Sequence, residues 1–150
     1  MSDAPKRKPV RGTRARSIAR KLTMQALYQW QMTGHSVSEL RRQFLEDASS
    51  AGVDEEYFGE LLAGCVAGST EIRAVLTPLL DRPIERLDPV EAAIPLIGAF
   101  ELKQRLDVPY RVVINEGLNL AKRFGATDAH KYVNAVLDRA ARELRPTEKQ

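Results

Sequence analysis

The stretch VPYRVVINEGLNLAKRFGATDAHKYVNAVLDRAAREL, residues 108–144, carries the clearest helical pattern in the chain. Its first part begins at Val108-Pro109 and ends at Gly125, and its apolar residues recur at spacings of three and four. Its second part follows a cap at Thr127 or Asp128 and keeps this spacing to the end of the stretch. The pattern predicts two amphipathic helices joined by a short turn.

The same helical period recurs through most of the chain, and no segment alternates with period two long enough to indicate a strand. One further helix is predicted from residue 14 to just before Gly34, and a short second one begins at a capping box formed by Ser36 and Glu39. A third helical stretch is predicted from Asp54 to Leu80, with a weak middle at Gly64 and Gly68. A fourth helix is predicted from Pro89 to about Gln104. The fold class is therefore all-α, with six or seven helices in two closely packed small bundles. We expect one domain over residues 14–146, with halves that meet near residue 82, and a polar tail over 147–150.

Proline breaks the pattern of the helix that begins at Pro89. Pro95 lies about two turns inside it, where a proline removes a backbone hydrogen bond. The sequence predicts either a kink at this position or a helix that begins later.

Charge is distributed unevenly along the 150 residues. Residues 1–22 carry eight bases against one acid, a net charge of +7, whereas the remaining 128 residues carry 15 bases and 19 acids, a net charge of −4. Residues 1–13 contain two prolines and few apolar side chains, so a flexible basic arm is expected. Arg14, Arg16 and Arg20 oppose the dipole of the helix that follows, which favours a role toward a polyanionic ligand such as nucleic acid.

Composition excludes several classes of protein. Cys65 is the single cysteine, so the chain cannot close an intramolecular disulfide, and a structural zinc site is not expected. No apolar run approaches the length of a membrane span and no signal peptide is recognisable, which favours the cytoplasm. Cys65 falls on an apolar helical stripe and is expected to be a core residue.

Catalytic signatures are missing from the sequence. His35 and His130 are far apart, and no phosphate loop, zinc motif or serine elbow occurs. The residues therefore give no support for catalysis, and no metal site or cofactor is expected.

Polar residues inside the stretch 108–144 go beyond what a plain helical bundle requires. We expect Asn115 and Glu116 to form buried hydrogen bonds between helices. Asp128, Lys131 and Tyr132, near a loop and a helix start, are expected to face a ligand.

Three motifs carry a resemblance to a known family. The segments PYRVVINEGLNLAKRFG and DAHKYVNAVLD, the segment ALYQW near residue 28, and DPVEAAIPLIGAFEL in the middle of the chain resemble the NusB family of transcription antitermination factors. The resemblance extends from about Arg14 to Pro146. Members of that family are all-α, with two small packed bundles, and are not enzymes.

The resemblance implies binding of boxA-like RNA together with NusE, a protein of the small ribosomal subunit. In the family this complex joins other Nus factors on RNA polymerase and suppresses premature termination, notably in ribosomal RNA operons. The resemblance implies RNA contacts at one set of positions and NusE contacts at another: Arg7, Arg11, Arg14, Arg16, Asp128, Lys131 and Tyr132 for RNA, and Tyr28 and Glu91 for NusE.

Simpler roles stay open for some of these residues. Tyr28 can belong to the core, and Glu91 can stabilise the helix in which it lies. Trp30 and Phe100 are expected to be packing residues. The sequence departs from the family at Pro95, where a basic residue is common, so the geometry around Glu91 is open.

Two other functions also stay open at this point. One is a helical adaptor that binds only protein, with the basic arm serving solubility. The other is the RNA-targeting domain of an RNA methyltransferase, although the chain contains no cofactor-binding fingerprint. Whether the protein forms a homodimer is likewise open.

Overall fold

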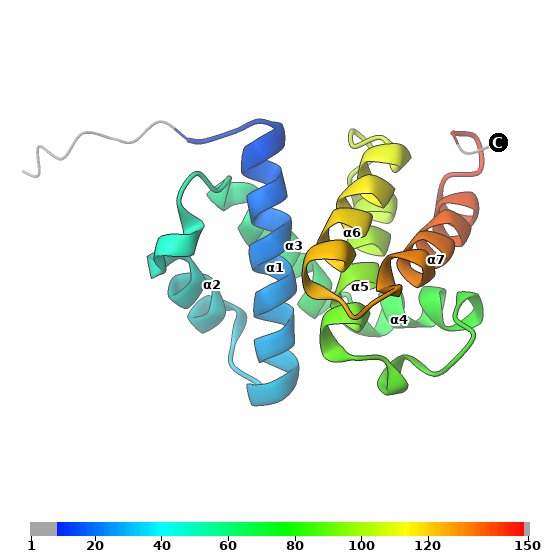
Figure 1. The fold of residues 1–150 in the computed structure, drawn as a ribbon. Helices are drawn as coiled ribbons and strands as arrows, with labels where there is room; N and C mark the ends of the chain where they lie inside the picture. Colours follow the sequence, from blue (N-terminus) through cyan, green and yellow to red (C-terminus); the bar gives the residue numbers. More distant parts are fainter. Residues whose placement is uncertain (1–8, 149–150) are drawn as a thin grey trace, which may run out of the picture.

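The computed structural model describes residues 9–148, and within this range it contains seven α-helices, three short 3-10 helices and no strand. This confirms the all-α prediction (Figure 1). Residues 1–8 of the predicted arm, Arg7 among them, and residues 149–150 of the predicted tail lie outside the described residues. The α-helices are α1 (Thr13–Thr33), α2 (Val37–Glu46), α3 (Glu55–Ala67), α4 (Ser69–Leu76), α5 (Pro89–Gln104), α6 (Tyr110–Phe124) and α7 (Ala129–Leu144), and the 3-10 helices are η1 (Ala48–Ser50), η2 (Thr77–Leu79) and η3 (Ile84–Arg86).

The helices form two groups that share a boundary along α5. Helices α1, α2 and α3 pack on one another, and α5, α6 and α7 pack on one another, with α4 against α5 (Figure 1). Helix α5 also contacts α1 and α3, so it joins the two groups. No helix within residues 9–148 has both the length and the apolar character needed to cross a membrane.

Helix boundaries follow the local signals in the sequence. Gly34 ends α1 in the left-handed conformation, with φ 70°, which glycine adopts without strain. The Ser36 side chain accepts a hydrogen bond from the Glu39 N–H at the start of α2, as a capping box requires. The stretch from Asp54 to Leu80 divides at Gly68 into α3 and α4, which agrees with the expected weak point in its middle.

Helix α5 begins at Pro89 and runs through Pro95 without interruption, so a later start is wrong. Every residue from Ala92 to Leu102 is buried, because α5 has neighbours on both sides. Close packing there depends on small residues. A Cβ added at Gly98 would lie 2.5 Å from a Leu137 methyl carbon of α7, and this contact leaves no room for a side chain.

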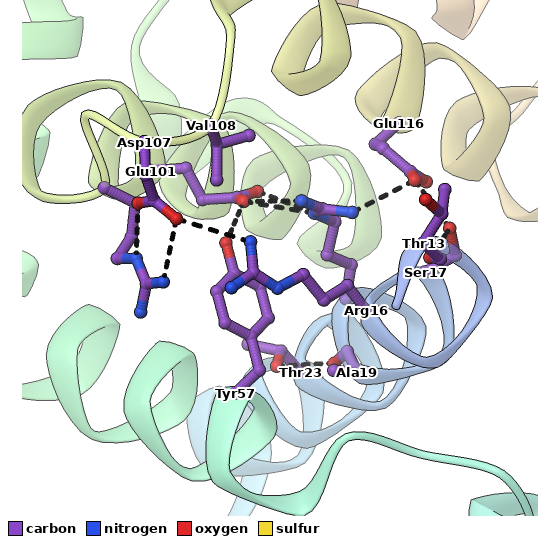
Figure 2. A network of polar contacts seen from close by, with 12 residues as sticks. Thr13, Arg16, Ser17, Ala19, Thr23, Tyr57, Glu101, Asp107, Val108 and Glu116 are labelled. Atoms are coloured by element: carbon purple, nitrogen blue, oxygen red, sulfur yellow. Dashed lines mark hydrogen bonds and ion pairs between the residues drawn. The ribbon is translucent and has the colours of Figure 1, made fainter. Parts of the chain in front are cut away.

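A buried ion pair joins the two groups of helices. Arg20 of α1 is 2% exposed and Glu101 of α5 is 1% exposed. The Arg20 Nε and Nη2 atoms donate to the Glu101 carboxylate at 2.9–3.1 Å, and Arg20 Nη1 donates to Glu116 of α6 at 3.0 Å (Figure 2). The Tyr57 hydroxyl of α3 also donates to Glu101, and burial together with that neighbouring carboxylate raises the pKa of Tyr57.

This network corrects one prediction and confirms another. The interpretation of Arg20 as a ligand-facing residue is wrong, because its buried guanidinium donates hydrogen bonds to the carboxylates of Glu101 and Glu116. Glu116 does form hydrogen bonds between helices, since it also accepts from Ser17 of α1. The same expectation is wrong for Asn115, which is exposed because the helical period turns it toward solvent.

A second buried arginine closes the carboxyl end of α5. Arg145, which is 4% exposed, donates to the backbone carbonyl oxygens of Glu101, Leu102, Arg105 and Val108. One of them, the Leu102 carbonyl, lies in the last turn of α5, where helical carbonyls lack a partner within the helix. Arg145 thereby fixes the connection between α5 and α6 on the end of α7.

Breaking the Arg20–Glu101 pair should destabilise the fold strongly. Arg20→Ala leaves the Glu101 carboxylate buried without its main partner, so we expect the free energy of unfolding to fall by about 3–5 kcal/mol. Urea unfolding monitored by circular dichroism measures this change. Arg142→Ala is the matched control, because the exposed Arg142 forms one ion pair within residues 9–148, with the half-buried Asp138, and its loss should cost less than about 0.5 kcal/mol. Equal losses in the two variants would contradict the structural role of the buried pair.

Candidate nucleic-acid interface

A basic groove lies between α1 and α6, and we call it the α1–α6 groove. Its volume is about 710 Å³. Four of its lining residues are basic and one is acidic, and the acid, Glu116, is already paired with Arg20. The groove is lined by Arg14, Ser17, Ile18, Lys21, Ser49, Ala51, Glu116, Asn119, Leu120, Lys122 and Arg123.

Helical geometry explains why these bases converge. Arg14 and Lys21 are seven residues apart, so they lie on one face of α1. Lys122 and Arg123 lie in the last turn of α6, where positive charge is favoured by the helix dipole. The ion pair between Arg20 and Glu116 holds α1 and α6 side by side, and the four cations therefore face a common space.

A second groove begins at the other side of the α1 N-terminus and extends to α3; we call it the balanced groove. It has a volume of about 590 Å³. Its basic residues are matched by equally many acids, so it offers no net attraction to a polyanion. The charged residues that line it are Arg11, Arg16, Arg20 and Arg105 against Asp54, Glu56, Glu60 and Asp107.

Arg16 is already engaged within the balanced groove. Its guanidinium carbon lies 4.4 Å from the centroid of the Tyr57 ring, and Nη1 lies 3.6 Å from Asp107 Oδ2 (Figure 2). Arg105 also binds Asp107, and this hydrogen bond holds the pKa of that carboxyl below its usual range. Arg16 is therefore less available to a ligand than Arg14, and Arg11 lies exposed at the edge of the same groove.

The loop between α6 and α7 holds Asp128 in an unusual conformation. Asp128 has φ 70°, and it is the one residue other than glycine with positive φ in the described part of the chain. Its side chain makes no hydrogen bond to the backbone of α7, so the predicted capping role is wrong. Instead the Asp128 carboxylate lies 3.4 Å from Nζ of Lys131 in the first turn of α7, and both side chains are exposed.

Tyr132 is less open than the sequence prediction implies. Its ring is partly buried and packs against the core. The guanidinium carbon of Arg82 lies 4.9 Å from the ring centroid. Asp128 and Lys131 are thus exposed, whereas the Tyr132 ring is partly buried and has the Arg82 guanidinium over it.

The two residues predicted to bind a protein partner are Tyr28 on α1 and Glu91 on α5. Tyr28 is 42% exposed, so it is not a core residue, and Met32 one turn later on α1 is 63% exposed. Glu91 lies in the first turn of α5, and Glu91 Oε1 accepts a hydrogen bond from the Ala126 N–H at 3.4 Å. Glu91 therefore touches the loop that carries Asp128.

The described residues contain no candidate metal site. Within residues 9–148 no group of three or more His, Cys, Asp or Glu side chains is arranged to hold a metal ion. Cys65 is completely buried, as expected for a core residue, and burial raises the pKa of its thiol. Trp30 and Phe100 pack with the core, as predicted.

Lys21, Lys122 and Arg123 were missed by the sequence reasoning. The seven-residue spacing between Arg14 and Lys21 was a usable signal for one face of α1. The pairing of that face with the end of α6 is a tertiary contact, which the spacing of residues along either helix does not encode.

The fold and the site together define the class of protein: a small all-helical protein with a basic groove between α1 and α6. The NusB family model matches residues 17–142. Over 134 residues the chain is 57% identical to the Transcription antitermination protein NusB of Alcanivorax borkumensis, which covers 89% of each chain. The chain belongs to the NusB family.

Solved structures agree with this assignment. A structure of T. maritima NusB matches with a TM-score of 0.79 and 26% identity, covering 89% of this chain and 95% of that one. A crystal structure of the antitermination factors NusB and NusE in complex with dsRNA matches with a TM-score of 0.74 and 27% identity, covering 88% of this chain and 99% of that one.

Proposed function

We propose that this protein is a transcription antitermination factor that binds boxA-like single-stranded RNA together with NusE. The observation that carries the proposal is the α1–α6 groove, in which four bases face one acid that is already neutralised. A similar fold in complex with NusE and dsRNA supports RNA and NusE as the partners. In this proposal the protein acts in the cytoplasm, promotes processive transcription, notably of ribosomal RNA operons, and reaches other Nus factors and RNA polymerase indirectly.

The RNA strand is proposed to follow the groove along α1 and to continue onto the α6–α7 loop. Arg14, Lys21 and Lys122 supply charge to phosphates, and this electrostatic attraction carries no sequence preference by itself. Selectivity then falls to exposed groups that reach base edges. The Asp128 carboxylate accepts hydrogen bonds from amino groups of bases, and Lys131 beside it offsets part of its charge.

NusE is proposed to bind the face of α1 that carries Tyr28, next to the start of α5. Tyr28 and Met32 present adjoining apolar area to a partner, and Glu91 offers an acid to a basic one. Because Glu91 also holds the Ala126 N–H, the partner and the RNA would meet at the α6–α7 loop. Binding of each is then expected to favour the other.

The salt dependence of RNA binding separates Arg14 from Arg16. We expect Arg14→Ala to weaken binding and to reduce the slope of log affinity against log salt by ~0.7, the contribution of one phosphate contact on a single strand. Arg16→Ala should change the slope less, since Arg16 binds phosphate only by giving up Asp107. Fluorescence anisotropy at several salt concentrations, with and without NusE, measures both.

Two controls complete this experiment. Arg142→Ala removes an equal charge from the far end of α7 and should leave the slope unchanged. A base-scrambled RNA should bind more weakly than the boxA-like strand, and NusE should widen the difference. An Arg14→Ala slope identical to that of the wild type would refute the groove as the RNA site.

Partner binding has its own test in Tyr28. Tyr28→Ala should weaken the complex with NusE at least about fivefold, because truncating an aromatic hot-spot residue of an interface costs more than about 1 kcal/mol. Isothermal titration calorimetry without RNA measures this loss. Leu106→Ala is the control, since Leu106 is 71% exposed but lies on the α5–α6 connection, and it should bind NusE like the wild type. Equal affinity of the Tyr28 variant and the control would remove Tyr28 from the interface.

A further inference from the structure

Arg82 forms a stacked pair with Tyr132. Arg82 lies in the segment between η2 and η3, and its guanidinium carbon is 4.9 Å from the centroid of the Tyr132 ring. The side chain of Arg82 is 51% exposed, and its one ion pair within residues 9–148 is an exposed contact of 3.5 Å between Nε and Asp81 Oδ1. The sequence predicted that the Tyr132 side chain faces a ligand. In the structure the half-exposed Arg82 guanidinium lies over the Tyr132 ring.

The position of this pair is fixed from both sides. The Tyr132 ring packs against the core, and its pKa is raised chiefly by burial. The end of η2, three residues before Arg82, is tied to α7 by a hydrogen bond of 2.9 Å from Arg139 Nη1 to the Leu79 carbonyl oxygen. The Tyr132 ring and this contact hold the start of the segment that carries Arg82 beside α7.

Arg82 also adjoins the residues proposed to bind RNA. Asp128, Lys131 and Tyr132 lie within one turn of each other at the start of α7, so an RNA strand on Asp128 and Lys131 passes beside the exposed part of Arg82. A planar, weakly hydrated guanidinium stacks well on a nucleobase, and single-stranded RNA offers unstacked bases.

We propose that Arg82 stacks on an RNA base, with Tyr132 as the support beneath its guanidinium. The inference rests on the proposed RNA-binding function and extends the RNA surface from the α6–α7 loop to the segment between η2 and η3. In this arrangement Tyr132 acts as a positioning residue through Arg82 and makes no direct contact with the base.

The variant Arg82→Lys separates stacking from simple charge attraction. Lysine keeps the positive charge but lacks the planar group, so stacking predicts an affinity loss of about fivefold or more with an unchanged salt slope. A phosphate contact predicts near-normal affinity for Arg82→Lys. The measurement is anisotropy of a labelled boxA-like RNA with the full-length protein, and Arg142→Ala serves as the charge-matched control for Arg82→Ala.

A spectroscopic readout protects the test against a change in folding. A boxA-like RNA carrying 2-aminopurine at successive positions should show one position whose fluorescence is quenched by the wild type and restored by Arg82→Lys. Tyr132→Phe keeps the ring beneath Arg82 and should retain that quenching.

The outcomes are distinct. Wild-type affinity of Arg82→Lys, or the absence of any position that responds to it, overturns the inference and leaves the proposed function intact. Failure of the wild type to prefer the boxA-like RNA over a scrambled strand overturns the proposed function, and the inference with it.

Discussion

The ion pair between Arg20 and Glu101 holds the two groups of helices together. Burying two charges costs free energy. The cost is offset here because each charged side chain has a further partner: Glu116 for the Arg20 guanidinium and the Tyr57 hydroxyl for the Glu101 carboxylate. Through these four residues the network connects α1, α3, α5 and α6. It therefore fixes the angle at which α1 lies against α6, and with it the shape of the α1–α6 groove.

The basic residues of α1 have three different roles despite their similar chemistry. Arg20 stabilises the interior, and Arg16 is bound to Tyr57 and Asp107 at the edge of the balanced groove. Arg14 and Lys21 face a space in which positive charge exceeds negative charge. The net charge of the N-terminal segment therefore overstates what is available to RNA, because part of it is already neutralised by acids from other helices.

Local signals predicted the helices well, since caps, glycines and apolar spacing act over a few residues. The end of α1 at Gly34 and the start of α5 at Pro89 are examples. Side-chain roles that depend on distant partners were less predictable. Arg20 was assigned to a ligand because its partner Glu101 is 81 residues away, and the conformation of Asp128 depends on the whole α6–α7 connection. Lys122 was missed from the candidate site for the same reason.

The proposed RNA path follows the α1–α6 groove and reaches the α6–α7 loop. Backbone amide chemical shifts of the ¹⁵N-labelled protein, recorded while a boxA-like RNA is added, show which groove the RNA enters. We expect the largest shifts at Lys21, Asn119 and Lys131, with little change at Glu56 and Glu60 in the balanced groove. Shifts concentrated at Glu56 and Glu60, with Lys21 and Asn119 unaffected, would contradict the proposed path.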